Sequence, residues 1–180
     1  MIRANKIARF YFAKKFERRK IMAIDFTKNN THIIAFPSYV ASAMGQYGHV
    51  INLIMDADAD NGVLATKGTY VTFENYNRVD VADNKVEGVI REIKNSEGGN
   101  YVEFTKLDGQ IFFVYNSPIS PYPETELREE GLFYNEAGDV TQGMELHLGD
   151  IVSLSDAAFT GTPVAGKTVK YSAGKYVVQP

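Results

Sequence analysis

The sequence of 180 residues contains no cysteine and no tryptophan, and it has no long hydrophobic run. Without cysteine, a disulfide framework, a thiolate metal site and a cysteine nucleophile are all excluded. No apolar run approaches the roughly 18 residues that a membrane-spanning helix needs. We therefore expect no membrane partner, and no metal or cofactor held through sulfur.

The residues that are present favour strands and turns. Tyrosine and phenylalanine each occur 11 times and glycine 15 times, a balance typical of β-strands joined by tight turns. A hydrophobic content of 44% is enough for a globular core. We predict a mainly β protein, a compact antiparallel β-sandwich or barrel with short hairpins, in which residues 22–180 form a single domain.

Charge is unevenly distributed along the chain. The formal net charge is −3, but residues 1–21 hold eight Lys and Arg against one Glu, which leaves 11 basic and 21 acidic residues in the remainder. Because nucleic-acid binding relies on basic surfaces, an acidic body argues against a nucleic-acid partner.

The basic segment 1–21 is compatible with an amphipathic helix that has Ile7, Phe10, Phe12 and Phe16 near one side. Such a helix would suit a membrane surface or nucleic acid, or the segment would be a targeting sequence. A third interpretation is that translation starts at Met22. Glu17-Arg18-Arg19 can be encoded by a purine-rich run that resembles a bacterial ribosome-binding site, and we expect this third alternative.

Several apolar runs predict strands. Residues 31–36 form a β-branched and aromatic run that we expect Pro37 to stop. Residues 49–55 are continuously apolar, as in a strand buried on both faces. Residues 85–93 predict a strand with a bulge, since Gly88 interrupts its β-branched residues.

The local pattern also predicts a hairpin. Residues 101–107 alternate between apolar and polar side chains, and Asp108-Gly109 separates them from the apolar run 110–115. An Asp-Gly pair between two such runs is a strong hairpin signal. Beyond it, residues 117–123 form a proline-rich connector, which we expect to be extended.

One segment matches the phosphate-loop pattern G-x-x-x-x-G-K-[ST], namely Gly161-Thr-Pro-Val-Ala-Gly166-Lys167-Thr168. A nucleotide site of this kind needs a helix directly after the lysine and threonine, whose N-terminus meets the phosphates. Residues 169–178 instead alternate as in a strand, and a Ser-Ala-Gly turn interrupts them. We therefore predict a β-hairpin turn with a solvated Lys167, and no nucleotide cofactor.

The aspartates Asp56, Asp58 and Asp60 resemble the start of a calcium-binding loop. Such a loop requires glycine at its sixth position and glutamate at its twelfth, where this chain has Asn61 and Lys67. The favoured interpretation is a polar turn between two strands. A weak, irregular calcium site formed by the three carboxylates stays open as the alternative.

Catalytic chemistry has little support in the sequence. His32, His49 and His147 are scattered among strand-like runs, and the chain has no Ser elbow or dinucleotide fingerprint. Isolated histidines are most often packing or surface residues. We therefore predict no catalytic residues, no cofactor and no enzyme activity.

The order of five short segments is similar to that in a group of small β-rich structural proteins of tailed bacteriophages that infect Gram-positive bacteria. The matching segments are Asp60-Asn-Gly-Val-Leu, Val86-Glu-Gly-Val-Ile90, Phe133-Tyr-Asn-Glu-Ala-Gly-Asp-Val140, Leu148-Gly-Asp-Ile-Val152 and Phe159-Thr-Gly-Thr-Pro-Val-Ala-Gly-Lys167. These are turn-and-strand motifs, which specify a fold better than an activity.

This resemblance implies a non-enzymatic virion component, akin to a capsid decoration protein. Its expected partners are the major capsid protein and copies of itself, and its expected location is the capsid exterior, after assembly in the host cytoplasm. Two alternatives remain open, a carbohydrate- or receptor-binding β-module and a tail or connector component.

Overall fold

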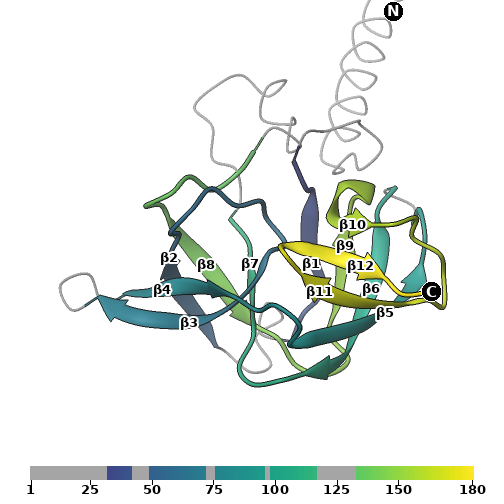
Figure 1. Ribbon diagram of the computed structural model, residues 1–180, viewed down its shortest axis with the longest axis horizontal. Helices are drawn as coiled ribbons and strands as arrows, with labels where there is room; N and C mark the ends of the chain where they lie inside the picture. Colours follow the sequence, from purple (N-terminus) through teal and green to yellow (C-terminus); the bar gives the residue numbers. More distant parts are fainter. Residues whose placement is uncertain (1–31, 42–48, 72–75, 96–97, 117–132) are drawn as a thin grey trace, which may run out of the picture.

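Strands make up most of the structure, a computed structural model that describes residues 32–41, 49–71, 76–95, 98–116 and 133–180 (Figure 1). The N-terminal helix expected within residues 1–21 and the connector 117–123 lie outside the described residues. The helical element of the described part is one short 3-10 turn, η3 (Asp156–Ala158). The strands are β1 (Ala35–Tyr39), β2 (Val50–Ile54), β3 (Leu64–Val71), β4 (Tyr76–Val81), β5 (Val86–Glu92), β6 (Asn100–Leu107), β7 (Phe112–Val114), β8 (Val140–Glu145), β9 (Ile151–Leu154), β10 (Phe159–Thr160), β11 (Thr168–Ser172) and β12 (Lys175–Val178).

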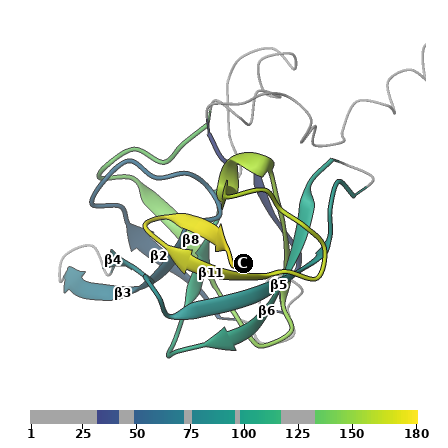
Figure 2. The ribbon, with the colours of Figure 1, turned by 45° about the vertical axis from the view of Figure 1, so that its right-hand side comes forward.

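The strands form two sheets that lie side by side (Figures 1 and 2). One is a seven-stranded sheet with the order β1-β9-β6-β5-β11-β12-β10, and the other is a closed barrel with the order β2-β4-β3-β7-β8. Neighbouring strands are antiparallel except β2 with β4 and β10 with β12. The prediction of a mainly β fold with a sandwich or barrel architecture is confirmed.

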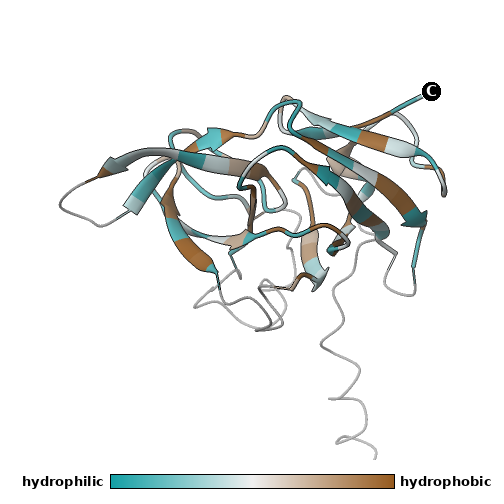
Figure 3. Ribbon diagram, turned by 90° about the horizontal axis from the view of Figure 1, so that it is seen from below, coloured by the Kyte–Doolittle hydropathy of each residue, from teal (hydrophilic) through white to brown (hydrophobic). Residues whose placement is uncertain are grey.

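The two sheets share one hydrophobic core. Barrel residues such as Leu53 and Phe112 belong to the same buried cluster as Ile90, Val102 and Leu154 of the seven-stranded sheet. Figure 3 shows hydrophobic and hydrophilic residues alternating along the strands of both sheets, as expected when one face of each strand is buried.

Two buried tyrosines connect the sheets. Tyr171 of β11 and Tyr176 of β12 lie opposite each other in the register, each only 1% exposed, with ring centroids 5.3 Å apart. The hydroxyl of Tyr176 donates to the carbonyl oxygen of Gly62 at 2.9 Å, and the amide of Leu64 donates to the hydroxyl of Tyr171 at 2.9 Å. The start of β3 in the barrel is therefore bonded directly to the terminal hairpin of the other sheet.

The bulged strand predicted over residues 85–93 is confirmed as β5. Its register with β6 shifts between Glu87 and Gly88 and again between Ile90 and Glu92. A Cβ atom at Gly88 would lie 2.9 Å from the carbonyl oxygen of Glu103, so the bulge brings the two backbones too close for a side chain.

Two strand predictions need correction. Pro37 does not stop a strand but lies within β1, where the register with β9 shifts between Phe36 and Tyr39. Among the described residues β1 pairs only with β9. An edge strand tolerates proline because its open side forms no hydrogen bonds to a neighbouring strand, so the missing amide hydrogen costs nothing there. β2 is not buried on both faces, since Val50 and Asn52 are exposed on the outside of the barrel.

The hairpin predicted around Asp108-Gly109 is wrong. β6 and β7, the strands on its two sides, belong to different sheets: β6 pairs with β5 and β9, and β7 pairs with β3 and β8. The amide of Asp108 donates to the carbonyl of Lys85 at 2.8 Å. The Asp-Gly pair bends the chain, with Gly109 at φ +95°, but it leads from one sheet to the other, because both edges of β6 already have partners.

The segment 161–167 is a turn, as predicted, but not a hairpin. β10 pairs in parallel with β12, whereas β11 pairs with β5 and β12, so β10 and β11 are not neighbours. The segment is fixed to β5 instead: the amide of Ile90 donates to Lys167 at 3.0 Å, and the amide of Gly166 donates to Ile90 at 2.7 Å. A strand and not a helix follows Thr168, and Lys167 is exposed.

Candidate binding cavity

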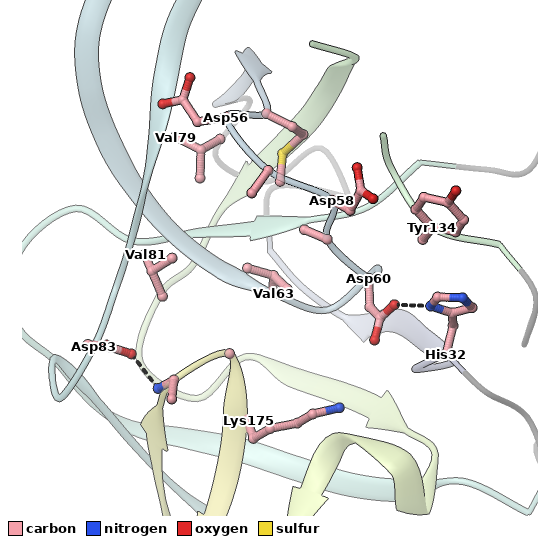
Figure 4. A pocket seen from close by; sticks show the side chains of 15 residues that line it. His32, Asp56, Asp58, Asp60, Val63, Val79, Val81, Asp83, Tyr134 and Lys175 are labelled. Carbon is pink, nitrogen blue, oxygen red and sulfur yellow. Dashed lines mark hydrogen bonds and ion pairs between the residues drawn. The ribbon is translucent and has the colours of Figure 1, made fainter. Parts of the chain in front are cut away.

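A cavity of about 680 Å³ opens between the barrel and the β11–β12 hairpin (Figure 4). Its walls come from the loop between β2 and β3, from β4 and the β4–β5 turn, from the β11–β12 hairpin and from two residues outside these elements, His32 and Tyr134. The lining residues are His32, Met55, Asp56, Ala57, Asp58, Ala59, Asp60, Val63, Val79, Val81, Asp83, Tyr134, Ala173, Gly174 and Lys175.

The loop between β2 and β3 is held in place by the segment that precedes β8. Ala59 and Asn135 form an antiparallel bridge, and the amide of Met55 donates to the carbonyl of Asp139 at 3.0 Å. The amide of Gly138 returns a bond to the carbonyl of Met55 at 2.8 Å. The loop that carries the three aspartates is therefore a fixed part of the fold.

Three asparagines stabilise this loop through side-chain hydrogen bonds. The side-chain amide of Asn61 donates to the carbonyl of Asn116 at 2.8 Å, and that of Asn116 donates to Asn135 at 2.9 Å. Asn135 in turn donates to the carbonyl of Ala59 at 3.1 Å. Asn61 and Asn135 are buried, and satisfied polar networks of this kind specify one backbone arrangement.

Each of the three aspartates from the sequence has a different partner. Asp56 forms an ion pair with Arg78, and Asp58 Oδ1 accepts the amide of Ala137 at 3.0 Å. Asp60 accepts a hydrogen bond from Nδ1 of His32 at 2.6 Å. The polar turn between two strands is confirmed, since the loop joins β2 to β3. Within the described ranges, no group of three or more His, Asp and Glu side chains is placed to hold a metal ion.

The ring of His32 forms a flat wall with Tyr134. The two rings are stacked, with centroids 4.9 Å apart and planes inclined by 23°. Asp60 fixes the orientation of His32 through Nδ1, and the amide of Ile33 donates to the second oxygen of Asp60 at 3.2 Å. Figure 4 shows the dashed bond from Asp60 to the edge of the His32 ring, with the ring of Tyr134 above His32 in this view.

The lining carries more negative than positive charge. Four carboxylates face one ammonium group, that of Lys175, which donates to the carbonyl of Ala157 at 2.9 Å. Asp83 accepts the amide of Ala173 at 2.6 Å and so joins the β4–β5 turn to the β11–β12 turn. The cavity is therefore acidic at its rim and apolar on the wall formed by Met55, Val63, Val79 and Val81.

The structure does not bring the three histidines together. His49 bonds to Glu145 on the barrel, where Gln110 also donates to Glu145 at 2.9 Å. Burial by itself raises the pKa of the Glu145 carboxyl, but the hydrogen bonds from Gln110 and His49 outweigh it, and the net pKa is lowered from the usual 4.5. His147 lies in the turn before β9, where its amide donates to Asp150 at 2.8 Å.

Sequence reasoning missed most of the cavity. No strand is predicted above for residues 76–81, which form strand β4. The alternation of Val79 and Val81 with the charged Arg78 and Asp80 was the available signal for a strand with one apolar face. Nothing local indicated that Tyr134 and Lys175 would line the same cavity as His32.

No protein-family model, curated protein sequence or solved structure matches this chain. In the described part of the chain, none of the helical segments has the length and apolar character needed to cross a bilayer. The geometry provides a preformed acidic cavity with one aromatic wall, which is suited to binding a ligand or a partner side chain.

Proposed function

We propose that this protein is a non-enzymatic structural component of a tailed-phage virion, a head decoration protein that binds the major capsid protein. The observation that carries the proposal is the aromatic edge strand β1 of the open seven-stranded sheet. Within the described ranges its neighbour is β9 alone. An edge strand of this kind can pair with a strand of a capsid lattice or of another copy through its backbone groups other than the nitrogen of Pro37, which has no hydrogen to donate.

Aromatic side chains beside this edge support the same assignment. Tyr39 is 57% exposed, and its ring makes an edge contact with that of Tyr101 at 6.5 Å. Phe36 contacts Tyr115 in a second edge-to-face pair at 5.9 Å. Tyrosine and phenylalanine are enriched in protein interfaces because they contribute a large contact area at a small entropic cost.

Four of the five segments that carry the phage resemblance contact one another, in two pairs. Asn135 of the 133–140 segment bonds to Asn61 of the segment that begins at Asp60. Gly166 and Lys167 of the 159–167 segment bond to Ile90 of the 86–90 segment. The fifth segment, 148–152, contacts the chain after β1 instead, since the buried Asp150 accepts the amide of Ala41 at 3.0 Å. Motifs that contact one another in this way are consistent with a shared scaffold.

The direct test is to locate the protein on particles of the phage whose genome carries its gene. We expect electron microscopy to show it on the outer face of the shell, and Tyr39→Ala to reduce its attachment to empty shells. Tyr70→Ala is the matched control, because Tyr70 is 50% exposed but lies on barrel strand β3. Absence from purified virions contradicts the proposal, and density on the tail or connector assigns the protein there instead.

A carbohydrate- or receptor-binding module is the second candidate. The specific observation that favours it is the cavity, where the stacked rings of His32 and Tyr134 lie beside the carboxylate of Asp60. Sugar sites combine an aromatic platform with carboxylate acceptors for hydroxyl groups. A glycan array with the purified protein tests this candidate, and a bound glycan that Tyr134→Ala releases would support it.

A further inference from the structure

We propose that the cavity between the barrel and the β11–β12 hairpin is a docking site for an arginine side chain of a partner protein. The inference deepens the proposed function and rests on it in one respect, that the partner is the capsid protein. The preference of the cavity for a guanidinium group is a separate property that is tested without a capsid.

The size and walls of the cavity suit a long side chain with a charged end. Its volume of about 680 Å³ falls within the roughly 300–1,000 Å³ of ordinary ligand sites. Met55, Val63 and Val79 are buried and line one wall. A methylene stem can lie against this apolar wall while its charged group reaches the acidic rim.

The charges at the rim favour a cationic occupant. Asp58, Asp60 and Asp83 line the cavity, and the ammonium group of Lys175 is turned to the carbonyl of Ala157. Asp58 accepts the amide of Ala137 through Oδ1, and a carboxylate has roughly four acceptor sites, so Asp58 retains capacity for a further donor. Asp56 is already neutralised by Arg78.

The aromatic wall favours a guanidinium over an ammonium group. The rings of His32 and Tyr134 lie within 23° of parallel, and Asp60 is bonded to His32 beside them. A guanidinium group is planar, stacks on aromatic rings and binds carboxylates through two parallel hydrogen bonds. An ammonium group has neither the flat face nor the fork geometry. The arrangement of ring and carboxylates around one hollow therefore fits arginine (Figure 4).

Charge complementarity also indicates where the arginine comes from. Beyond residue 21 the chain holds 11 basic and 21 acidic residues, so its own body is a poor source of a docking cation. A basic surface on the capsid exterior would be complementary to the acidic body and would place one arginine in the cavity. The cavity then gives the contact its specificity, while β1 supplies contact area.

The first experiment titrates the full-length protein with the peptide Ac-Gly-Arg-Gly-NH2 by calorimetry, alongside the same peptide with citrulline or lysine at the central position. Citrulline has the shape of arginine without its charge. We expect the arginine peptide to bind at least about tenfold more tightly than the citrulline peptide, since charge-assisted hydrogen bonds contribute about that much.

The variant Asp58→Asn removes one rim charge and keeps an oxygen that accepts the amide of Ala137, so the loop is preserved. The matched control is Asp80→Asn, an exposed aspartate on β4 between two lining valines whose own side chain does not line the cavity. We expect Asp58→Asn to weaken arginine binding about tenfold and Asp80→Asn to leave it unchanged. Equal effects of the two variants, or tighter binding of the citrulline peptide, would overturn the inference.

The second experiment separates the cavity from the virion role. Wild type and both variants are mixed with empty shells of the phage that carries the gene. The inference is supported if wild type and Asp80→Asn attach to the shells and Asp58→Asn does not. Equal attachment of all three overturns it while the decoration role stands. If nothing attaches but the arginine peptide binds, the decoration role fails and the guanidinium site stands. Tight binding of a peptide of residues 1–21 in the cavity would show that the chain itself supplies the cation, against the inference.

Discussion

Replacing Tyr176 by phenylalanine isolates one contact between the two sheets. The hydroxyl of Tyr176 donates to the carbonyl of Gly62 at 2.9 Å, and the residue is only 1% exposed. Phenylalanine keeps the ring contacts with Tyr171 at 5.3 Å and with Phe159 at 6.0 Å. The substitution therefore removes a hydrogen bond and leaves the hydrophobic packing nearly unchanged.

The cost follows from the burial of the acceptor. Gly62 is buried two residues before the barrel strand β3, so bulk water cannot replace the lost hydrogen bond to its carbonyl. A buried acceptor left without its donor costs about 1–3 kcal/mol of stability. For a chain of this length each kcal/mol shifts the melting temperature by about 2–4 °C. We expect a decrease of about 2–12 °C.

Urea unfolding followed by far-ultraviolet circular dichroism gives the free energy of unfolding directly, and a thermal scan gives the melting temperature. Tyr39→Phe is the control, because its hydroxyl lies on a side chain that is 57% exposed and its loss should change stability by less than about 0.5 kcal/mol. A change below about 0.5 kcal/mol for Tyr176→Phe as well would refute the argument that this bond connects the sheets.

Three further predictions concern stability. Burial raises the pKa of Tyr171 and of Tyr176 above the usual 10.0. The unfolded chain therefore loses these protons near pH 10 while the folded chain keeps them, so the free energy of unfolding should fall above pH 10, by up to about 1.4 kcal/mol per pH unit for each group. Urea unfolding at several alkaline pH values should show a shallower fall for Tyr171→Phe than for wild type, and equal slopes would count against the assignment. Gly62→Ala should lower the free energy of unfolding more than Gly166→Ala. Both positions have positive φ (+88° and +85°), and a residue other than glycine loses about 1–2 kcal/mol of stability in that conformation. Only at Gly62 would the added Cβ also clash with another atom, Ala35 Cβ at 2.6 Å. Equal losses in urea unfolding would contradict the clash. Ala173→Asn should stabilise by up to about 1 kcal/mol, because Ala173 has φ +49° in an exposed two-residue turn with Gly174, where asparagine is preferred; a lower melting temperature would contradict this.

Local chemistry in the sequence was a reliable guide to where the chain turns. Gly62, Gly109, Gly166 and Gly174 all have positive φ, and each lies in a segment that the sequence marked as a loop or turn. The bulge at Gly88 was also predictable, because a glycine among β-branched residues signals a close backbone approach.

Strand partners were not predictable in the same way. Asp108-Gly109 bends the chain whether or not the flanking strands pair, and the choice of partner depends on which edges are free. β6 is bordered by β5 and β9, so the chain after Gly109 continues into the barrel as β7. Pro37 was likewise compatible with a strand only because β1 lies at an edge.

The cavity depended entirely on tertiary structure. The aspartates of the β2–β3 loop were visible in the sequence, but each has a partner from a distant segment: Arg78 for Asp56, Ala137 for Asp58 and His32 for Asp60. Three carboxylates in one loop repel, and separate partners relieve that repulsion better than convergence on one point.

The sequence by itself determined that the protein is mainly β, where its turns lie and that a strand follows Lys167, because these features depend on residue preferences within a few positions. Only the tertiary structure decided that the strands divide into a closed barrel and an open sheet joined by Tyr171 and Tyr176. It also brought His32, Tyr134 and Lys175 together around the cavity. The physical reason is that long-range pairing depends on burial and on the competition for strand edges, which no short window of sequence contains.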